Sequence, residues 1–327
     1  MQSKKLGLIG IGGIGQLHLK HGLMLPNAEV VAVADTAKAA LARAKAMGIK
    51  KTFTDYTEMF KDPQIDAVLI ALPTHLHLEC AVQAAEAHKD IFLEKPIAVT
   101  VEEAKAVISA AQRNSVKLMM GYPMRFNRRF QKIKQDIADG LIGDAENAHA
   151  TYICAGPFVA RADGTSPAPV PDWWFDPAKS GGGVLVDLGC HIINLMRMLF
   201  GEVTAVKGQF GHRYNVDFED SAMVLARFTS GTLAVINVGW YSQEYLLRLD
   251  VLGSVRSVSV QHATPPTVAN AYQMLTKGIN TFNQPHFEEL QHFVNCLHND
   301  QVPLSTGLDG LRDLETILEA YKNSLIL

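Results

Sequence analysis

A glycine-rich turn near the start of the chain constrains the fold more than any other feature. Residues 6–12 read LGLIGIG, which predicts a buried strand that ends in a turn, and residues 14–25 predict a helix. Between them the spacing GxGxxG is formed by Gly10-Ile11-Gly12-Gly13-Ile14-Gly15. Gly10 permits a tight turn, Gly12 lets the backbone approach a pyrophosphate, and Gly15 lets helix and strand pack closely. The motif therefore predicts a dinucleotide bound at the positive end of this helix.

The first third of the chain repeats the same alternation of strand and helix. Further apolar strands are predicted at residues 29–35, 66–73, 90–96 and 117–123, and amphipathic helices at 37–47, 77–88 and 101–114. Continuously apolar strands that alternate with helices are typical of parallel sheets covered on both faces. The sequence therefore predicts an N-terminal α/β Rossmann domain.

The pattern changes after Pro123. Helices are predicted at about 127–139, 183–199, 285–299 and 307–324, a Pro/Gly-rich loop at 156–174, and alternating strands within 203–214, 221–241 and 246–260. Such strands, joined at Ser230-Gly231 and Gly253-Ser254, favour a large open, mainly antiparallel sheet in an α+β domain. A chain of 327 residues is long enough for two domains, which we place at 1–123 and 124–327.

Composition narrows the classes of partner. A net charge of −3 gives no electrostatic reason to expect nucleic acid or an anionic membrane. The sequence has no run near 18 apolar residues, so no membrane span is expected. The four cysteines form no CxxC pair, which favours reduced thiols and a cytoplasmic location.

Asp35 ends the second predicted strand. A carboxylate there can accept hydrogen bonds from the adenosine ribose and would repel a 2′-phosphate, which favours NAD over NADP. The residue also precedes a predicted helix, so it could serve at that helix N-terminus; the two roles are compatible. NADP remains possible.

Two charged motifs are candidates for chemistry. Glu94-Lys95-Pro96 ends the fourth strand, at the edge where ligands bind in parallel sheets. The alternative is an exposed charged pair at a strand end. Further along, three glycines at 181–183 precede Asp187 and His191, which share one face of a helix. A histidine can accept the proton of an alcohol, a carboxylate can orient its ring, and the glycines permit close approach to a ligand. The alternative for Asp187 and His191 is a surface pair.

Together these motifs resemble the Gfo/Idh/MocA family, which includes inositol and sugar dehydrogenases. The resemblance spans nearly the whole chain and includes two further turns. Residues 73–77, with Pro73, Thr74 and His77, resemble the cofactor-contacting turn after the third strand, although PTHLH departs from the frequent Pro-Asn-x-x-His. Residues 121–126, which include Arg125, resemble the segment that leads into the second domain. The resemblance implies a homodimer or homotetramer assembled on the open sheet.

Residue roles follow from the same resemblance. Lys95, Asp187 and His191 match the family's catalytic residues, and Glu94 and Lys95 would lie near the nicotinamide ribose. Arg125 is a further candidate for the cofactor. The implied reaction is NAD-dependent oxidation of a secondary hydroxyl of a polyol or sugar. Candidate substrate contacts, taken from predicted position alone, are Tyr152, Trp174, Asn194 and Tyr241.

Three other functions were weighed. A zinc-dependent alcohol dehydrogenase would need converging Cys and His ligands, and the close pairs His18/His21 and His75/His77 have no cysteine beside them, so no metal is expected. An NADP-linked reductase of a sugar or carbonyl compound remains an alternative. A non-catalytic NAD-binding regulator is disfavoured, since it would not need Lys95, Asp187 and His191 together.

Overall fold

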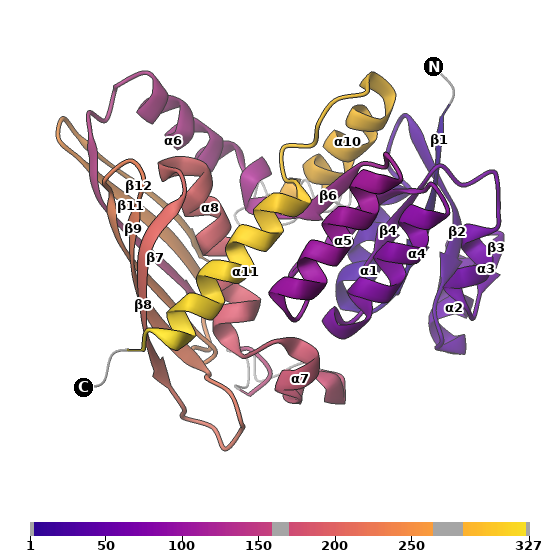
Figure 1. Ribbon diagram of the computed structural model, residues 1–327, viewed down its shortest axis with the longest axis horizontal. Coiled ribbons are helices and arrows are strands. Elements are labelled where there is room, and N and C mark those ends of the chain that lie inside the picture. The colour runs from indigo at the N-terminus through magenta and orange to yellow at the C-terminus, as the bar shows by residue number, and fades with distance from the viewer. Residues whose placement is uncertain (1–2, 159–169, 264–283, 325–327) are drawn as a thin grey trace. The chain divides into compact units, whose positions relative to one another are not determined.

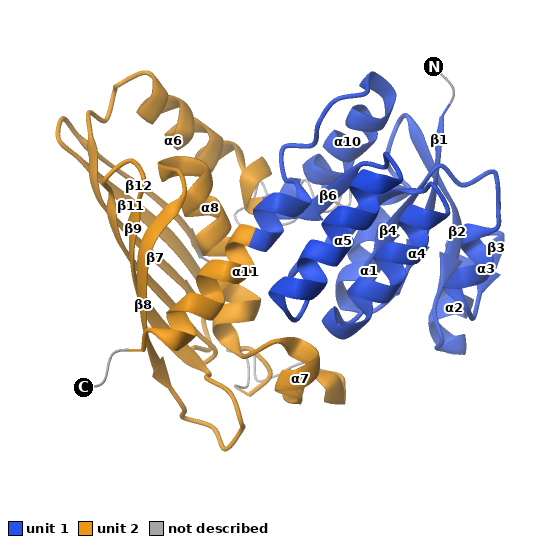
Figure 2. Ribbon diagram, in the orientation of Figure 1, with its two compact units in different colours: residues 1–123, 282–311 blue, residues 124–281, 312–327 orange. Residues whose placement is uncertain are grey.

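The structure is a computed structural model that describes residues 3–158, 170–263 and 284–324. The chain divides into two compact units (Figure 2). Unit 1 contains residues 1–123 and 282–311, and unit 2 contains residues 124–281 and 312–327. The first division lies at residue 123, where the sequence also places one, but residues 282–311 return to unit 1.

Unit 1 is built on a six-stranded parallel sheet with the strand order β3-β2-β1-β4-β5-β6 (Figure 1). Its strands are β1 (Lys4–Ile9), β2 (Ala28–Ala34), β3 (Lys51–Phe53), β4 (Ala67–Ile70), β5 (Asp90–Glu94) and β6 (Leu118–Gly121). The helices are α1 (Gly13–Gly22), α2 (Lys38–Ala46), α3 (Tyr56–Phe60), α4 (His77–Glu86), α5 (Val101–Arg113) and α10 (Gln284–Asn299). Helix α4 packs with α5, and α1 packs with α10. The Rossmann architecture expected from the sequence is confirmed.

Unit 2 is built on a second six-stranded sheet with the order β12-β11-β7-β10-β9-β8. Its strands are β7 (Ala145–Ile153), β8 (Val203–Gly211), β9 (Ser221–Phe228), β10 (Leu233–Gly239), β11 (Leu246–Gly253) and β12 (Ser257–Ala263). Only β7 and β10 pair in parallel, and the other pairs are antiparallel. The mainly antiparallel sheet is confirmed, but β7, in the middle of the sheet, was not predicted.

One face of this sheet forms the core of unit 2. Along β9 the side chains alternate, so that Ala222, Val224, Ala226 and Phe228 are buried and the residues between them are accessible. The buried face belongs to the same core as α6 (Arg128–Ala138), α8 (Cys190–Phe200) and the part of α11 (Gly307–Lys322) that lies in unit 2. The positions of these helices beside the sheet are visible in Figure 1.

One helical stretch, Pro177–Phe200, is long and apolar enough to cross a membrane by length and composition. Of its most apolar window, 83% is buried within the structure, which is the environment of a core helix in a globular protein.

Candidate active site

The glycine turn has the geometry that its motif predicts. Gly10 has a positive φ of 85°, and a Cβ on Gly15 would lie 2.1 Å from the Gly10 carbonyl oxygen. In contrast, a Cβ on Gly12 or Gly13 would meet no atom within 4 Å. Gly10 and Gly15 are therefore required by the turn and by packing, whereas Gly12 and Gly13 border open space at the N-terminus of α1. This open cradle of backbone fits a pyrophosphate.

Asp35 links the glycine turn to the second helix. Its carboxylate accepts hydrogen bonds from the amide of Ile11 at 2.7 Å and from the amide of Ala37 at 2.8 Å. Both roles considered from the sequence are compatible with this position, because the half-buried carboxylate lies between the turn and the start of α2.

The turn after β4 places His77 differently from what the sequence suggested. Thr74 is buried in a short 3₁₀ helix that follows Pro73. The ring nitrogens of His77 face the carbonyl oxygens of Pro96 at 2.8 Å and Leu72 at 2.9 Å, and burial lowers the pKa of the ring. His77 therefore braces the loops after β4 and β5, and we do not retain its side chain as a cofactor contact.

Glu94, predicted to face a ligand together with Lys95, has a buried carboxylate. Its Oε1 lies 2.5 Å from His18 Nε2, and its Oε2 accepts the Lys95 amide at 3.1 Å. Burial alone would raise the pKa of Glu94, but the hydrogen bond and charge of His18 and the charge of Lys95 lower it. The Glu94 carboxylate therefore does not face the cofactor itself. It can affect the cofactor through Lys95, which is half-buried at the carboxyl end of β5.

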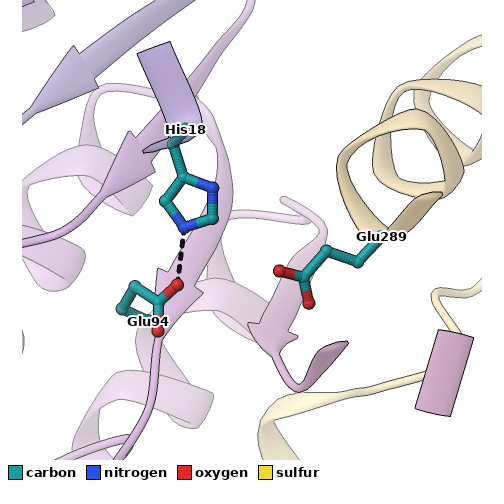
Figure 3. A group of neighbouring side chains, drawn as sticks. All are labelled: His18, Glu94 and Glu289. Atoms are coloured by element: carbon teal, nitrogen blue, oxygen red, sulfur yellow. Dashed lines mark hydrogen bonds and ion pairs between the residues drawn. The ribbon is translucent and has the colours of Figure 1, made fainter. Parts of the chain in front are cut away.

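His18, Glu94 and Glu289 form a buried cluster in unit 1 (Figure 3). One nitrogen or oxygen of each lies within 4.8 Å of the others, a spacing compatible with metal ligands. A tetrahedral zinc ion bound to both His18 and Glu94 would hold their ligand atoms about 3.4 Å apart, since each bond is about 2.1 Å long. The observed 2.5 Å is too short for two ligands of one zinc ion and corresponds to a direct hydrogen bond between the two side chains.

In unit 2, Asp187 and His191 lie on one continuous helical segment. Asp187 is in a π-helical turn, Leu185–Gly189, and His191 follows in the first turn of α8. π-Turns occur frequently at functional sites. The ring of Tyr152 on β7 lies 6.4 Å from that of His191, and burial, with the charge of Asp187 among the smaller causes, raises the pKa of Tyr152. Tyr152 therefore stays a candidate neighbour of the reacting group.

Two of the three glycines before Asp187, Gly182 and Gly183, serve internal packing, which corrects the interpretation that they admit a ligand. A Cβ on Gly183 would lie 2.0 Å from the Glu219 carbonyl oxygen, and one on Gly182 would lie 2.6 Å from the Tyr321 hydroxyl. The Glu219 carboxylate accepts the amides of Gly183 at 3.3 Å and Leu185 at 2.9 Å. Glu219 and Tyr321 thus hold the turn that carries Asp187.

Arg125 and Asn194 belong to a buried polar chain in unit 2. Arg125 Nε donates to Asn194 Oδ1 at 2.7 Å, and Asn194 Nδ2 donates to Asp313 Oδ2 at 2.6 Å. Asp313 also accepts from Arg197 at 2.6 Å, and burial raises its pKa to about 6 despite the arginines. Both ends of the Asn194 amide are engaged, so we do not retain Asn194 as a substrate contact.

The two remaining aromatic candidates lie in different places. Trp174 is half-buried in a 3₁₀ turn, Asp172–Phe175, with its ring 5.6 Å from that of Trp240. Tyr241 folds over Gly239 and its hydroxyl is 3.4 Å from Asn237, on the sheet face opposite to the buried one. We therefore retain Trp174 as a candidate substrate contact and no longer retain Tyr241. Of the predicted loop at 156–174, residues 159–169 lie outside the described residues.

Several residues that position the site have little recognisable signal in the sequence. His18 was considered only as half of a metal-ligand pair, and Glu219, Glu289 and Tyr321 were not singled out. These residues lie near groups that are 34 to 271 positions away in the chain, and local sequence spacing gives no signal of such long-range proximity. A carboxylate within an otherwise apolar helical face, as at Glu289, is the one signal that the sequence offers.

Comparison with known proteins places this geometry in a family. Residues 4–122 match the family described as "Oxidoreductase family, NAD-binding Rossmann fold" (GFO_IDH_MocA), and residues 130–259 match the GFO/IDH/MocA C-terminal domain. The chain therefore belongs to the Gfo/Idh/MocA oxidoreductases, as its motifs predicted, and its Rossmann domain binds NAD.

Individual relatives cover nearly the whole chain. The myo-inositol 2-dehydrogenase of Thermotoga maritima is 28% identical over 94% of this chain and 92% of its own length. The inositol 2-dehydrogenase of Rhizobium meliloti is 30% identical over 95% of this chain and 93% of its own. A solved dehydrogenase structure from Thermotoga maritima is 26% identical, with a TM-score of 0.84 over 98% of this chain and 96% of that one.

Proposed function

We propose that this protein is an NAD-dependent dehydrogenase that oxidises a secondary hydroxyl of a cyclic polyol or sugar. The observation that carries the proposal is the arrangement of one sheet edge in unit 1. The glycine turn, the Pro73-Thr74 turn and Lys95 follow the carboxyl ends of β1, β4 and β5, which are neighbouring strands. In parallel sheets this edge binds the dinucleotide, so Lys95 is a charged group at the cofactor edge.

Each of the proposed catalytic residues has a separate role in the reaction. NAD supplies the acceptor for the hydride that leaves the carbinol carbon. His191 takes the hydroxyl proton, so that the C–O bond becomes a carbonyl, and Asp187 orients the imidazole and stabilises its charged form. Lys95 donates a hydrogen bond to the substrate oxygen and stabilises negative charge as it develops.

The relatives and the aromatic residues of unit 2 both support a cyclic polyol or sugar as the substrate. Two relatives that cover more than nine tenths of the chain are inositol dehydrogenases. Trp174 and Tyr152 are aromatic and half-buried in unit 2, and such rings can bind the apolar face of a carbohydrate while their polar atoms bind hydroxyls. Inositols and pyranose-like sugars are therefore the first compounds to test.

The test is a panel of polyols with NAD, in which NADH absorbance is followed for myo-inositol, scyllo-inositol, levoglucosan and D-glucose. We expect at least one to react, and Lys95→Ala and His191→Ala to lower kcat for it by about 10²- to 10⁴-fold. Both variants should still bind NADH, because the glycine turn and Asp35 lie on other elements. Folded His191→Ala protein with wild-type turnover would exclude His191 as the base and leave Lys95 as the leading candidate.

A further inference from the structure

The buried cluster of His18, Glu94 and Glu289 gathers polar groups that the proposed reaction does not use. His18 comes from α1, Glu94 from the end of β5 and Glu289 from α10, and all three are buried. Figure 3 shows the carboxylate of Glu289 pointing toward the hydrogen-bonded pair of His18 and Glu94. Within the described part of the chain, neither oxygen of Glu289 has a hydrogen-bond partner.

Buried polar atoms are usually satisfied, so this arrangement needs an explanation. Glu289 carries the larger cost, because its whole carboxyl group is in the interior. Burial and the negative charge of Glu94 raise the pKa of Glu289 well above its ordinary value. The pKa of Glu94 shifts in the opposite direction, so of the two carboxyl groups Glu289 is the one that binds a proton more readily.

The charged carboxylate of Glu94 is fixed from several sides. His18 holds Oε1 and the Lys95 amide donates to Oε2. On β6, a Cβ at Gly121 would lie 3.1 Å from both Cδ and Oε1 of Glu94, so the neighbouring strand leaves little space for another rotamer. His18 itself is fully buried and packs edge-on against Phe92, at 5.2 Å between ring centroids.

This arrangement connects the two ends of the cofactor edge in unit 1. Helix α1 begins at the glycine turn and carries His18 in its second turn. His18 holds Glu94, and Glu94 holds the backbone of the next residue, Lys95. Helix α1, whose N-terminus faces the expected pyrophosphate site, therefore also fixes the position of the Lys95 backbone through His18 and Glu94.

We propose that His18 is a positioning residue for Lys95, acting through the Glu94 carboxylate, with Glu289 as the third member of the buried cluster. The catalytic consequence rests on the function proposed above for Lys95, whereas the placement of Lys95 does not. A donor at position 18 is what the cluster requires, since an apolar side chain there would leave Glu94 charged, buried and without its main partner.

The experiment compares His18→Gln, which can keep an N–H near the position of Nε2, with His18→Leu, which cannot. With the fastest substrate of the panel, we expect His18→Leu to lower kcat by about 10- to 100-fold with little change in NADH affinity. His18→Gln should recover most of that loss. The control is His21→Leu, which removes another buried histidine of α1 that makes no hydrogen bond to Glu94 in the described structure.

A second readout does not depend on turnover. Reductive methylation with isotope-labelled formaldehyde gives each lysine an NMR signal, and the signal lost in Lys95→Arg identifies Lys95. This signal should shift in His18→Leu and stay in place in His18→Gln and His21→Leu. If His18→Leu does not fold, Glu94→Leu serves instead, because it removes both hydrogen bonds of the carboxylate.

The outcomes separate the two proposals. Wild-type turnover in Lys95→Ala would overturn the catalytic role of Lys95, while the NMR signal would still decide how Lys95 is placed. An unchanged Lys95 signal in folded His18→Leu or Glu94→Leu would overturn the positioning role. Equal losses of turnover in His18→Gln and His18→Leu would also overturn it, because the donor would then be irrelevant.

Discussion

The hydroxyl of Tyr321 donates a hydrogen bond to Glu219 across 2.7 Å, although the two residues are 102 positions apart. The partners of Glu219 on the other side are the amides of Gly183 and Leu185, which begin the segment with Asp187 and His191. Tyr321 near the C-terminus thus stabilises the start of the proposed catalytic helix. Both ends of this contact lie in unit 2, so the segment is held within one unit.

The first prediction concerns this contact. Tyr321→Phe removes one hydrogen bond to a buried carboxylate and should lower the free energy of unfolding by about 1–3 kcal/mol. Glu219→Ala should cost more, since it leaves two amides and a hydroxyl without their acceptor. Chemical denaturation of the three proteins measures the order. A Glu219→Ala protein as stable as wild type would show that the carboxylate does not hold the turn.

The second prediction separates two glycines of one motif. A Cβ on Gly12 meets open space, so Gly12→Ala should fold with near wild-type stability and bind NAD more weakly, because the methyl group occupies the cradle. A Cβ on Gly15 would lie 2.1 Å from the Gly10 carbonyl oxygen, so Gly15→Ala should be strongly destabilised. Thermal unfolding and NADH fluorescence titration measure both. Equal stability of the two variants would contradict the assignment.

These two cases show which parts of the site can be predicted from the sequence. The glycine turn, Asp35 and the parallel strands are local patterns, so their placement followed from residue type and period. Gly182 and Gly183 are equally visible in the sequence, but glycine is needed there because of Glu219 and Tyr321, which are distant in sequence. The same limit applies to Glu94, whose position at a strand end is predictable and whose burial against His18 is not. Strand β7 was missed because it has few apolar residues and pairs only with later segments.

The third prediction concerns cofactor choice. The Asp35 carboxylate is fixed beside the glycine turn by the amides of Ile11 and Ala37. Like charges brought together cost several kcal/mol, and about 1.4 kcal/mol corresponds to tenfold in affinity. NAD should therefore bind at least tenfold more tightly than NADP, with exposed Lys38 reducing the difference, and Asp35→Ser should narrow the gap. Titration with both cofactors tests this, and tighter NADP binding by the wild type would contradict the role of Asp35.

The fourth prediction concerns assembly through the open sheet of unit 2. Its accessible face carries Met223, Leu225 and Leu233, which are 54%, 49% and 45% exposed, and Leu225 pairs with Val235 on the next strand. An apolar patch of this kind marks an interface. We propose a homodimer or homotetramer that buries this face.

Light scattering at micromolar concentration measures the state. Leu225→Arg places a charge in the centre of the patch and should shift the protein toward the monomer. Leu308→Arg, which changes an equally exposed leucine in unit 1, should leave the assembly unchanged. A monomeric wild-type protein would refute the proposal, and so would the same shift in both variants.

The last prediction concerns the pH dependence of stability caused by Glu289. Burial and the charge of Glu94 raise the pKa of Glu289 in the folded state, so the folded protein binds this proton more tightly than the unfolded chain does. The stabilisation is fully present below the unfolded-state pKa, about 4.3, and is lost as the pH rises toward the folded-state pKa. Within that window each pH unit lowers the free energy of unfolding by about 1.4 kcal/mol.

Glu289→Gln replaces the neutral acid by a neutral amide of similar shape and removes this titration. Its stability relative to wild type should therefore rise as the pH increases above the unfolded-state pKa of about 4.3. Urea denaturation across this range measures the difference, and Glu86→Gln, at an exposed end of α4, should give a flat difference. A flat difference for Glu289→Gln as well would mean that Glu289 is ionised in the folded protein. The cluster would then hold two negative charges, and the assignment of Glu289 as its neutral member would be wrong.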